Sequence, residues 1–215
     1  MQIAILTFDG FNEIDSFVAA SILNRLRPEG WTAYIASPTP TVTSMNGVKI
    51  ERQKPLEFAN DADAVIVGSG NQTRAIAVDA DILTRLSLDP SRQLIGAQCS
   101  GALLLSKMGL LENVPACTDM ITKPWVMEAG VDVLDAPFFA SGNVATAGGC
   151  LASQYLAAWI MLQGAGKETA VKALRYVAPV GEQEAFVAHA LEVVAPSKAM
   201  ERMGKPLLAD SAAAV

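Results

Sequence analysis

Hydrophobic positions alternate along the chain between short apolar runs and longer stretches in which they recur at helical spacing. The short runs predict strands at residues 2–8, 31–36, 63–67, 94–98, 115–118, 131–134 and 144–146. The helical spacing predicts helices near residues 14–26, 73–88, 101–107, 125–129, 150–162 and 182–194, with another ending near residue 176. Asn46-Gly47, a turn dipeptide, predicts a hairpin between Val42 and Ile50.

Strands that alternate with helices predict an α/β fold with a doubly wound, mainly parallel sheet. The pattern shows neither an internal repeat nor a linker, so we expect a single domain over residues 1–215, frayed after about residue 197. Hydrophobic residues make up 51% of the chain and charged residues 18%. That balance is typical of sheets whose central strands are covered on both faces.

The charge and residue composition of the chain disfavour several classes of function. The net charge of −6 disfavours a nucleic-acid partner. No apolar run is long enough for a membrane span and no signal-like segment opens the sequence, so we expect a cytoplasmic protein without membrane contact. The three cysteines lack metal-ligand spacing, and no Walker or dinucleotide-binding fingerprint occurs. We therefore expect neither a metal nor a cofactor.

Cys99 stands where an apolar run meets a segment of small, helix-compatible residues. A strand, a tight turn and a helix in that order resemble a nucleophile elbow. The unpaired N–H groups of a helix N-terminus favour a thiolate, and lowering a thiol pKa from roughly 8.5 by about two units would make the thiolate the majority form. The alternative is a cysteine that fills space in the core.

Other polar residues fall at the carboxyl ends of predicted strands, where ligands bind in such sheets. Asp15 lies in the first helix, and its carboxyl group can face Cys99 only if the two groups share a proton. A protonated Asp15 would then donate to the sulfur and relay protons, with Glu13 as a competitor. Backbone N–H groups at Gly68-Ser69, joined by that of Ser100, are candidates for an oxyanion hole.

Two further cysteines and one histidine are alternative candidates for reactive residues. Cys150 follows Gly148-Gly149 at another predicted helix start and rivals Cys99, whereas Cys117 lies inside a strand pattern that indicates core. His189, the chain's one histidine, lies on the late amphipathic helix. Unless that helix folds over the pocket, there is no Cys-His dyad, which disfavours protease and glutamine-amidotransferase chemistry.

Four segments carry a family resemblance: Phe8 with Ile14-Asp15, then residues 65–70, 97–102 and 145–149. Over residues 3–176 the chain resembles the ThiJ/PfpI superfamily, which has the flavodoxin-like, class I glutamine amidotransferase-like fold. The resemblance selects Cys99 over Cys150 and matches Asp15 to the family's acidic residue. An aspartate there is similar to the isocyanide hydratase branch.

The chain also departs from the family pattern. Asp119 stands after Thr118 where many members have a histidine, and we expect both residues at the pocket. Val67-Gly68-Ser69 replaces a common Pro-Gly-Gly, and Val18-Ala19 replaces the Gly-Pro typical of the hydratase branch. These departures leave the substrate less defined than the fold and the cysteine.

The resemblance implies a cofactor-independent, hydratase-like enzyme that acts on a small-molecule substrate and forms a homodimer. In the hydratase branch the cysteine attacks the isocyanide carbon, and the resulting thioimidate is hydrolysed to an N-formamide. The alternatives are glyoxalase or deglycase chemistry on α-oxoaldehydes and a non-enzymatic redox sensor, since an exposed low-pKa thiolate oxidises first.

Overall fold

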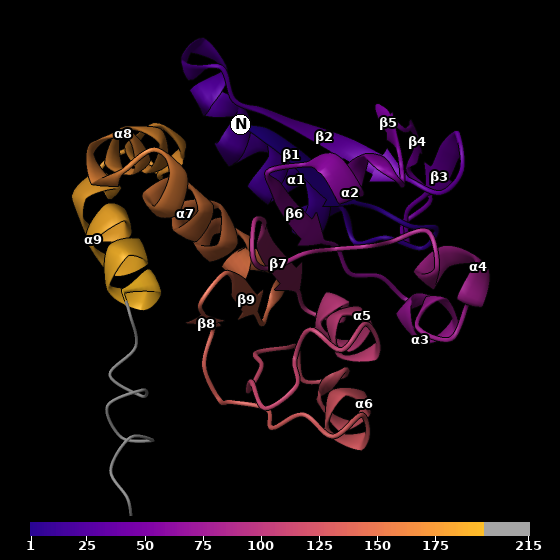
Figure 1. Cartoon of the computed structure of the whole chain (residues 1–215). Helices are drawn as coiled ribbons and strands as arrows, with labels where there is room; N and C mark the ends of the chain where they lie inside the picture. The colour runs from indigo at the N-terminus through magenta and orange to yellow at the C-terminus, as the bar shows by residue number, and fades with distance from the viewer. Residues whose placement is uncertain (196–215) are drawn as a thin grey trace, which may run out of the picture.

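The structure of the chain, a computed structural model, describes residues 1–195 (Figure 1). The fraying expected after about residue 197 lies outside these residues. The strands are β1 (Gln2–Leu6), β2 (Thr32–Ser37), β3 (Thr41–Thr43), β4 (Lys49–Glu51), β5 (Lys54–Pro55), β6 (Ala64–Val67), β7 (Leu94–Gln98), β8 (Phe138–Ser141) and β9 (Val144–Ala147). The α-helices are α1 (Glu13–Leu23), α2 (Phe58–Asp61), α3 (Thr73–Ile76), α4 (Ala80–Leu83), α5 (Gly101–Lys107), α6 (Lys123–Glu128), α7 (Ser153–Gly164), α8 (Lys167–Val177) and α9 (Gln183–Val194).

Seven strands form the central sheet, in the order β5-β2-β1-β6-β7-β9-β8. Every neighbouring pair is parallel except β8 and β9, which are antiparallel. Strands β3 and β4 form the separate hairpin that Asn46-Gly47 predicted. The mainly parallel, doubly wound sheet predicted from the sequence is therefore confirmed.

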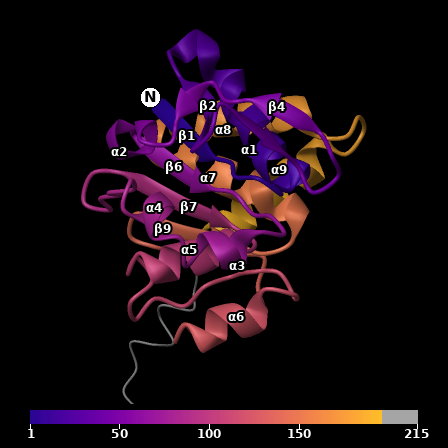
Figure 2. The ribbon, with the colours of Figure 1, turned by 90° about the vertical axis from the view of Figure 1, so that its right-hand side faces the viewer.

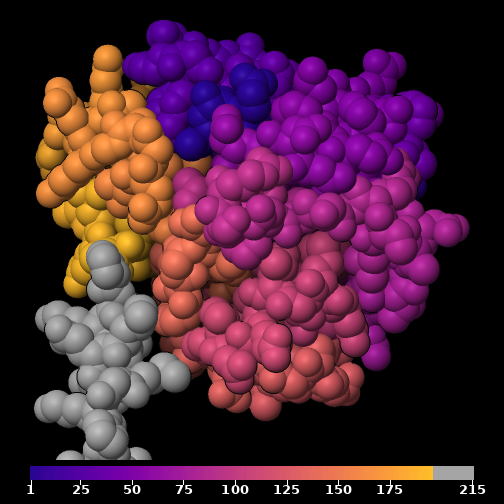
Figure 3. Space-filling model, in the orientation of Figure 1, coloured from indigo at the N-terminus to yellow at the C-terminus, as the bar shows by residue number. Residues whose placement is uncertain are grey.

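Side-chain alternation along the strands divides the core between the two faces of the sheet. Ile3 and Ile5 of β1 pack with α1, α7, α8 and α9, whereas Ala4 and Leu6 pack with α2, α3, α5 and α6. Figure 2 shows the two groups of helices on opposite sides of the strands, and in Figure 3 the C-terminal helices form one flank of the molecule. Burial on both faces explains why the strands read as continuous apolar runs.

Three parts of the sequence-based assignment are wrong. The helix expected over 73–88 is two short helices, because Asp79 leaves helical geometry and caps α4 by accepting from the N–H of Asp81. The strands expected at 115–118 and 131–134 shrink to one isolated bridge, Ala116 to Val133. The edge strand β8 was missed because Phe138 follows a Pro-containing segment without alternation.

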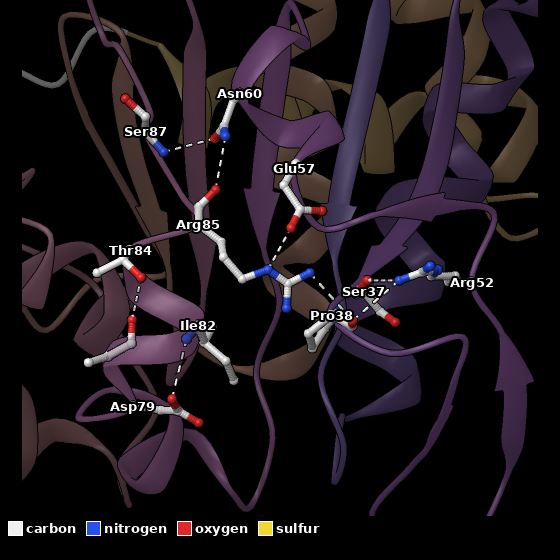
Figure 4. Close-up of polar contacts among 11 residues, drawn as sticks. Ser37, Pro38, Arg52, Glu57, Asn60, Asp79, Ile82, Thr84, Arg85 and Ser87 are labelled. Carbon is white, nitrogen blue, oxygen red and sulfur yellow. Dashed lines mark hydrogen bonds and ion pairs between the residues drawn. The ribbon is translucent and has the colours of Figure 1, made fainter.

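A polar network ties the segment after α4 to its neighbours, as Figure 4 shows. The Asn60 side chain donates to the Arg85 carbonyl oxygen and accepts from the Ser87 N–H. The Arg85 guanidinium donates to the Glu57 carboxylate at 2.6 Å. These contacts fix the long connection into β7, the strand that ends immediately before Cys99.

The carboxyl ends of β1, β6, β7 and β9 meet at one edge of the sheet, because these four strands are neighbours and parallel. The segments that leave them carry the residues singled out from the sequence. Within residues 1–195, no helix combines the length and the apolar character that a membrane crossing requires.

Candidate active site

Cys99 occupies a strained turn between β7 and α5. Its φ of 45° lies in the left-handed region, which a non-glycine residue adopts at a cost of about 1–2 kcal/mol. The Cys99 N–H donates to the Ala147 carbonyl oxygen at 2.8 Å, and the Thr118 hydroxyl donates to the Cys99 carbonyl oxygen at 2.8 Å. Contacts from two other segments thus hold the strand–helix elbow that the sequence predicted.

Asp15 lies fully buried in the first turn of α1. One of its carboxylate oxygens lies within 4.8 Å of the Sγ atoms of Cys99 and Cys150, and its Oδ2 accepts a hydrogen bond from the Ser69 hydroxyl. Its Oδ1 has no hydrogen-bond partner among the described residues. The competitor, Glu13, points elsewhere and accepts hydrogen bonds from side chains of the β3–β4 hairpin.

Cys150 joins this pair, although the family resemblance selected Cys99 over it. One carboxylate oxygen of Asp15 and the Sγ atoms of Cys99 and Cys150 all lie within 4.8 Å of one another. The Asn12 Nδ2 donates to the Cys150 Sγ at 3.2 Å, while the Asn12 Oδ1 caps α1. The sequence did offer one indication that Cys150 belongs to the site. Cys150 follows Gly148-Gly149 directly after a strand that neighbours β7.

The electrostatics of the site favour a different protonation of the pair from the one expected from the sequence. Burial, followed by the charge of Asp15, raises the pKa of the Cys99 thiol, and the hydrogen bond from Gln98 opposes that rise only in part. Burial also raises the pKa of Asp15, with the Ser69 hydrogen bond acting against it. Because a thiol starts from the higher ordinary pKa and burial raises it further, these effects favour the proton on sulfur and leave Asp15 as the candidate base.

Alkylation of Cys99 should therefore become fast only above the ordinary thiol midpoint of roughly 8.5. The rate is followed by peptide-resolved mass spectrometry across pH, with Cys117 as the internal reference because burial raises its pKa to about 12. In Asp15→Asn the Cys99 midpoint should fall, since the negative charge that raises it is gone. A wild-type midpoint below 8.5 contradicts this assignment.

Only some of the N–H groups predicted to form an oxyanion hole are free to donate to a substrate. The Gly68 N–H donates to the Leu6 carbonyl oxygen at 3.0 Å, and Gly68 does not line the pocket. Its role is steric, because an added Cβ would lie 2.6 Å from that same oxygen. The N–H groups of Ser69 and Ser100 have no acceptor within residues 1–195, and both residues line the pocket. These two serines remain the candidates for donors to a developing anion.

Thr118 and Asp119 line the pocket as expected. The Asp119 carboxylate accepts from the N–H groups of Ile121 and Thr122 at 2.9 Å and from the Thr122 hydroxyl at 2.6 Å. Asp119 therefore shapes the loop before α6, and its charge contributes to the raised pKa of Asp15.

The pocket has a volume of about 800 Å³ and opens above the Asp15, Cys99 and Cys150 cluster. Its outer wall includes Met120 and Ile121, whose side chains are largely exposed. His189 is not part of it, because its ring packs against Tyr155 with centroids 6.2 Å apart. As the chain has one histidine, the described pocket contains none, and a Cys-His dyad is excluded.

Fold and site together define an α/β protein with a mainly parallel sheet and a cysteine at a strand–helix elbow. The DJ-1/PfpI family model matches residues 1–163, and the chain belongs to this family. A comparison with curated proteins finds no match.

Solved structures show the same fold. Schizosaccharomyces pombe DJ-1 is 16% identical, with a TM-score of 0.72 over 83% of this chain and 100% of the other. Drosophila melanogaster DJ-1beta is 21% identical, with a TM-score of 0.72 over 82% and 96%. A ThiJ/PfpI family protein from Pseudomonas syringae is 22% identical, with a TM-score of 0.71 over 90% and 87%.

Proposed function

We propose that this chain is a cofactor-independent hydratase that adds water to a small electrophile, an isocyanide, through a thioimidate on Cys99. The observation that carries the proposal is the unpartnered Oδ1 of a fully buried Asp15 in the cluster with the Cys99 thiol. A carboxylate whose pKa is raised by burial is a stronger base than one in water, and it can take and return a proton without leaving the site.

In the first half of the reaction, Asp15 accepts the thiol proton while the Cys99 sulfur attacks the terminal carbon of the isocyanide. Asp15 then gives the proton to that carbon, and the product is the thioimidate Cys–S–CH=N–R. Proton removal and C–S bond formation occur together, so the high pKa of the free thiol is compatible with the reaction.

In the second half, water adds to the thioimidate carbon as Asp15 passes a proton from the water to the nitrogen. The C–S bond then breaks, and the proton of the new hydroxyl returns to sulfur through Asp15. The released product is the N-formamide, and isocyanide plus water balances formamide. The N–H groups of Ser69 and Ser100 are candidates for contacts with the oxygen.

The pocket favours a substrate with an apolar substituent, because Met120, Ile121 and Trp125 are among the residues that line it. An isocyanide carries no net charge and offers one reactive carbon, which suits a site whose thiols lie beside a single carboxylate and whose described lining contains no histidine. We further propose that the protein forms a homodimer. Sedimentation of the purified chain measures this directly.

The proposal is tested by incubating the reduced protein with an alkyl isocyanide and measuring the N-formamide by mass spectrometry. In heavy water the formyl carbon should carry deuterium, because its hydrogen comes from the exchangeable Cys99–Asp15 proton. Rapid acid quenching should trap one isocyanide mass on the peptide that contains Cys99.

Trapping on Cys150 instead, or formamide without any adduct, would contradict the assigned nucleophile. No formamide from any alkyl isocyanide would overturn the function. Lactate formed from methylglyoxal would then indicate the glyoxalase alternative, and sulfinate on Cys99 after mild peroxide, ahead of Cys117 and Cys150, would indicate a sensor.

A further inference from the structure

The cluster of Asp15, Cys99 and Cys150 has the composition of a metal-binding site. Its three potential ligand atoms, one carboxylate oxygen and two sulfurs, lie within 4.8 Å of one another. A Zn–S bond is about 2.3 Å long, so two sulfurs that bind one tetrahedral cation lie about 3.8 Å apart. Small side-chain adjustments therefore bring all three atoms into coordination distance.

Each of the three side chains also accepts a hydrogen bond from a neutral donor. Gln98 Nε2 donates to the Cys99 Sγ at 3.3 Å, and Asn12 Nδ2 donates to the Cys150 Sγ at 3.2 Å. Ser69 donates to the Asp15 Oδ2. Metal sites commonly contain such outer contacts, which orient the ligands and support their charged forms.

The second, independent observation is an unused ligand atom. Asp15 is fully buried, yet its Oδ1 has no hydrogen-bond partner within residues 1–195. A buried carboxylate oxygen without a partner is unfavourable, and a cation removes that penalty. Ionisation of all three groups would place three negative charges together, which a dication reduces to one.

We propose that Asp15, Cys99 and Cys150 bind a thiophilic divalent cation, with Zn²⁺ as the best chemical match. Two thiolates and one carboxylate leave a fourth tetrahedral position for water, and all three residues line the pocket. Binding breaks two S–H bonds, forms two metal–sulfur bonds and releases two protons to solvent. The cation occupies Cys99, so its binding inhibits any reaction in which Cys99 is the nucleophile.

The test uses Co²⁺ as a coloured probe for Zn²⁺, added to the fully reduced chain without oxygen. Wild type should develop intense sulfur-to-cobalt charge-transfer bands that Zn²⁺ abolishes, and Zn²⁺ should release two protons per site in weakly buffered solution. Cys150→Ser should lose at least about 10-fold in affinity, show weaker bands and release one proton. Cys117→Ala is the matched control and should behave as wild type, because Cys117 lies outside the cluster.

Absence of charge-transfer bands in wild type, or equal affinity in Cys150→Ser with unchanged circular dichroism, would overturn the inference. The measurement needs no turnover, so it is separate from the proposed hydratase. Formamide production without cobalt bands rejects the metal site alone, whereas cobalt bands without formamide reject the hydratase alone.

Discussion

Replacing Cys99 with alanine should lower the rate of formamide formation by at least about three orders of magnitude, which corresponds to about 4 kcal/mol of transition-state stabilisation. The substitution removes the sulfur that is held at the elbow, within 4.8 Å of a carboxylate oxygen of Asp15. The Cys150 sulfur lies within the same distance, but Cys150 begins a 3-10 helix and is not at the strand–helix elbow. Steady-state product formation, measured beside Cys117→Ala, gives the comparison.

The same comparison separates the two cysteines of the cluster. If Cys99→Ala retained activity while Cys150→Ala lost it, the nucleophile would be Cys150 and the elbow would serve only to position Asp15. If both variants were fully active, the reaction would not use a thiol at all. Circular dichroism and thermal unfolding of each variant distinguish loss of chemistry from loss of fold.

The sequence could predict that the site residues lie close together, because their positions follow from the order and direction of the strands. Strands recognised by their apolar runs and joined through helices are parallel, so Asp15, Ser69 and Cys99 had to approach the same sheet edge. The elbow could be predicted because an apolar run typical of a strand ends at Cys99, where a segment of small, helix-compatible residues begins. Neither prediction required knowledge of any side-chain contact.

What the sequence could not supply depends on contacts between distant segments. Burial and the charge of Asp15, 84 positions away, raise the pKa of the Cys99 thiol. The Gly68 N–H was unavailable because Leu6 accepts it across two neighbouring strands. The Cys150 sulfur accepts a hydrogen bond from Asn12, which lies 138 positions earlier in the chain. The pattern of residues around each position does not show which distant residue that position will contact.

Replacing Asp15 with asparagine should make the protein more stable at neutral pH and nearly inactive. Asparagine has almost the same shape and can still accept from the Ser69 hydroxyl, but it cannot take the Cys99 proton. Loss of a general base lowers rates by about 10²–10⁴-fold, so formamide formation should fall within that range. Retained activity would show that another group moves the proton.

The stability gain follows from the direction of the Asp15 pKa. A carboxyl pKa raised by folding gives stability that is fully present below the unfolded value of 3.8 and is lost as pH rises through the folded value. The asparagine side chain does not titrate, so urea unfolding should show Asp15→Asn gaining about 1–3 kcal/mol over wild type at neutral pH, with the gain shrinking toward pH 3.8.

Glu13→Gln is the matched control, because it alters a carboxyl group two positions away whose pKa is shifted in the opposite direction. Hydrogen bonds, chiefly from Ser44, lower the pKa of Glu13, so its contribution is present above the unfolded value of 4.5 and disappears as pH falls. Glu13→Gln should therefore lose stability at neutral pH and match wild type in acid. If both variants changed in the same direction, burial of an ionised Asp15 would not be what destabilises the active site.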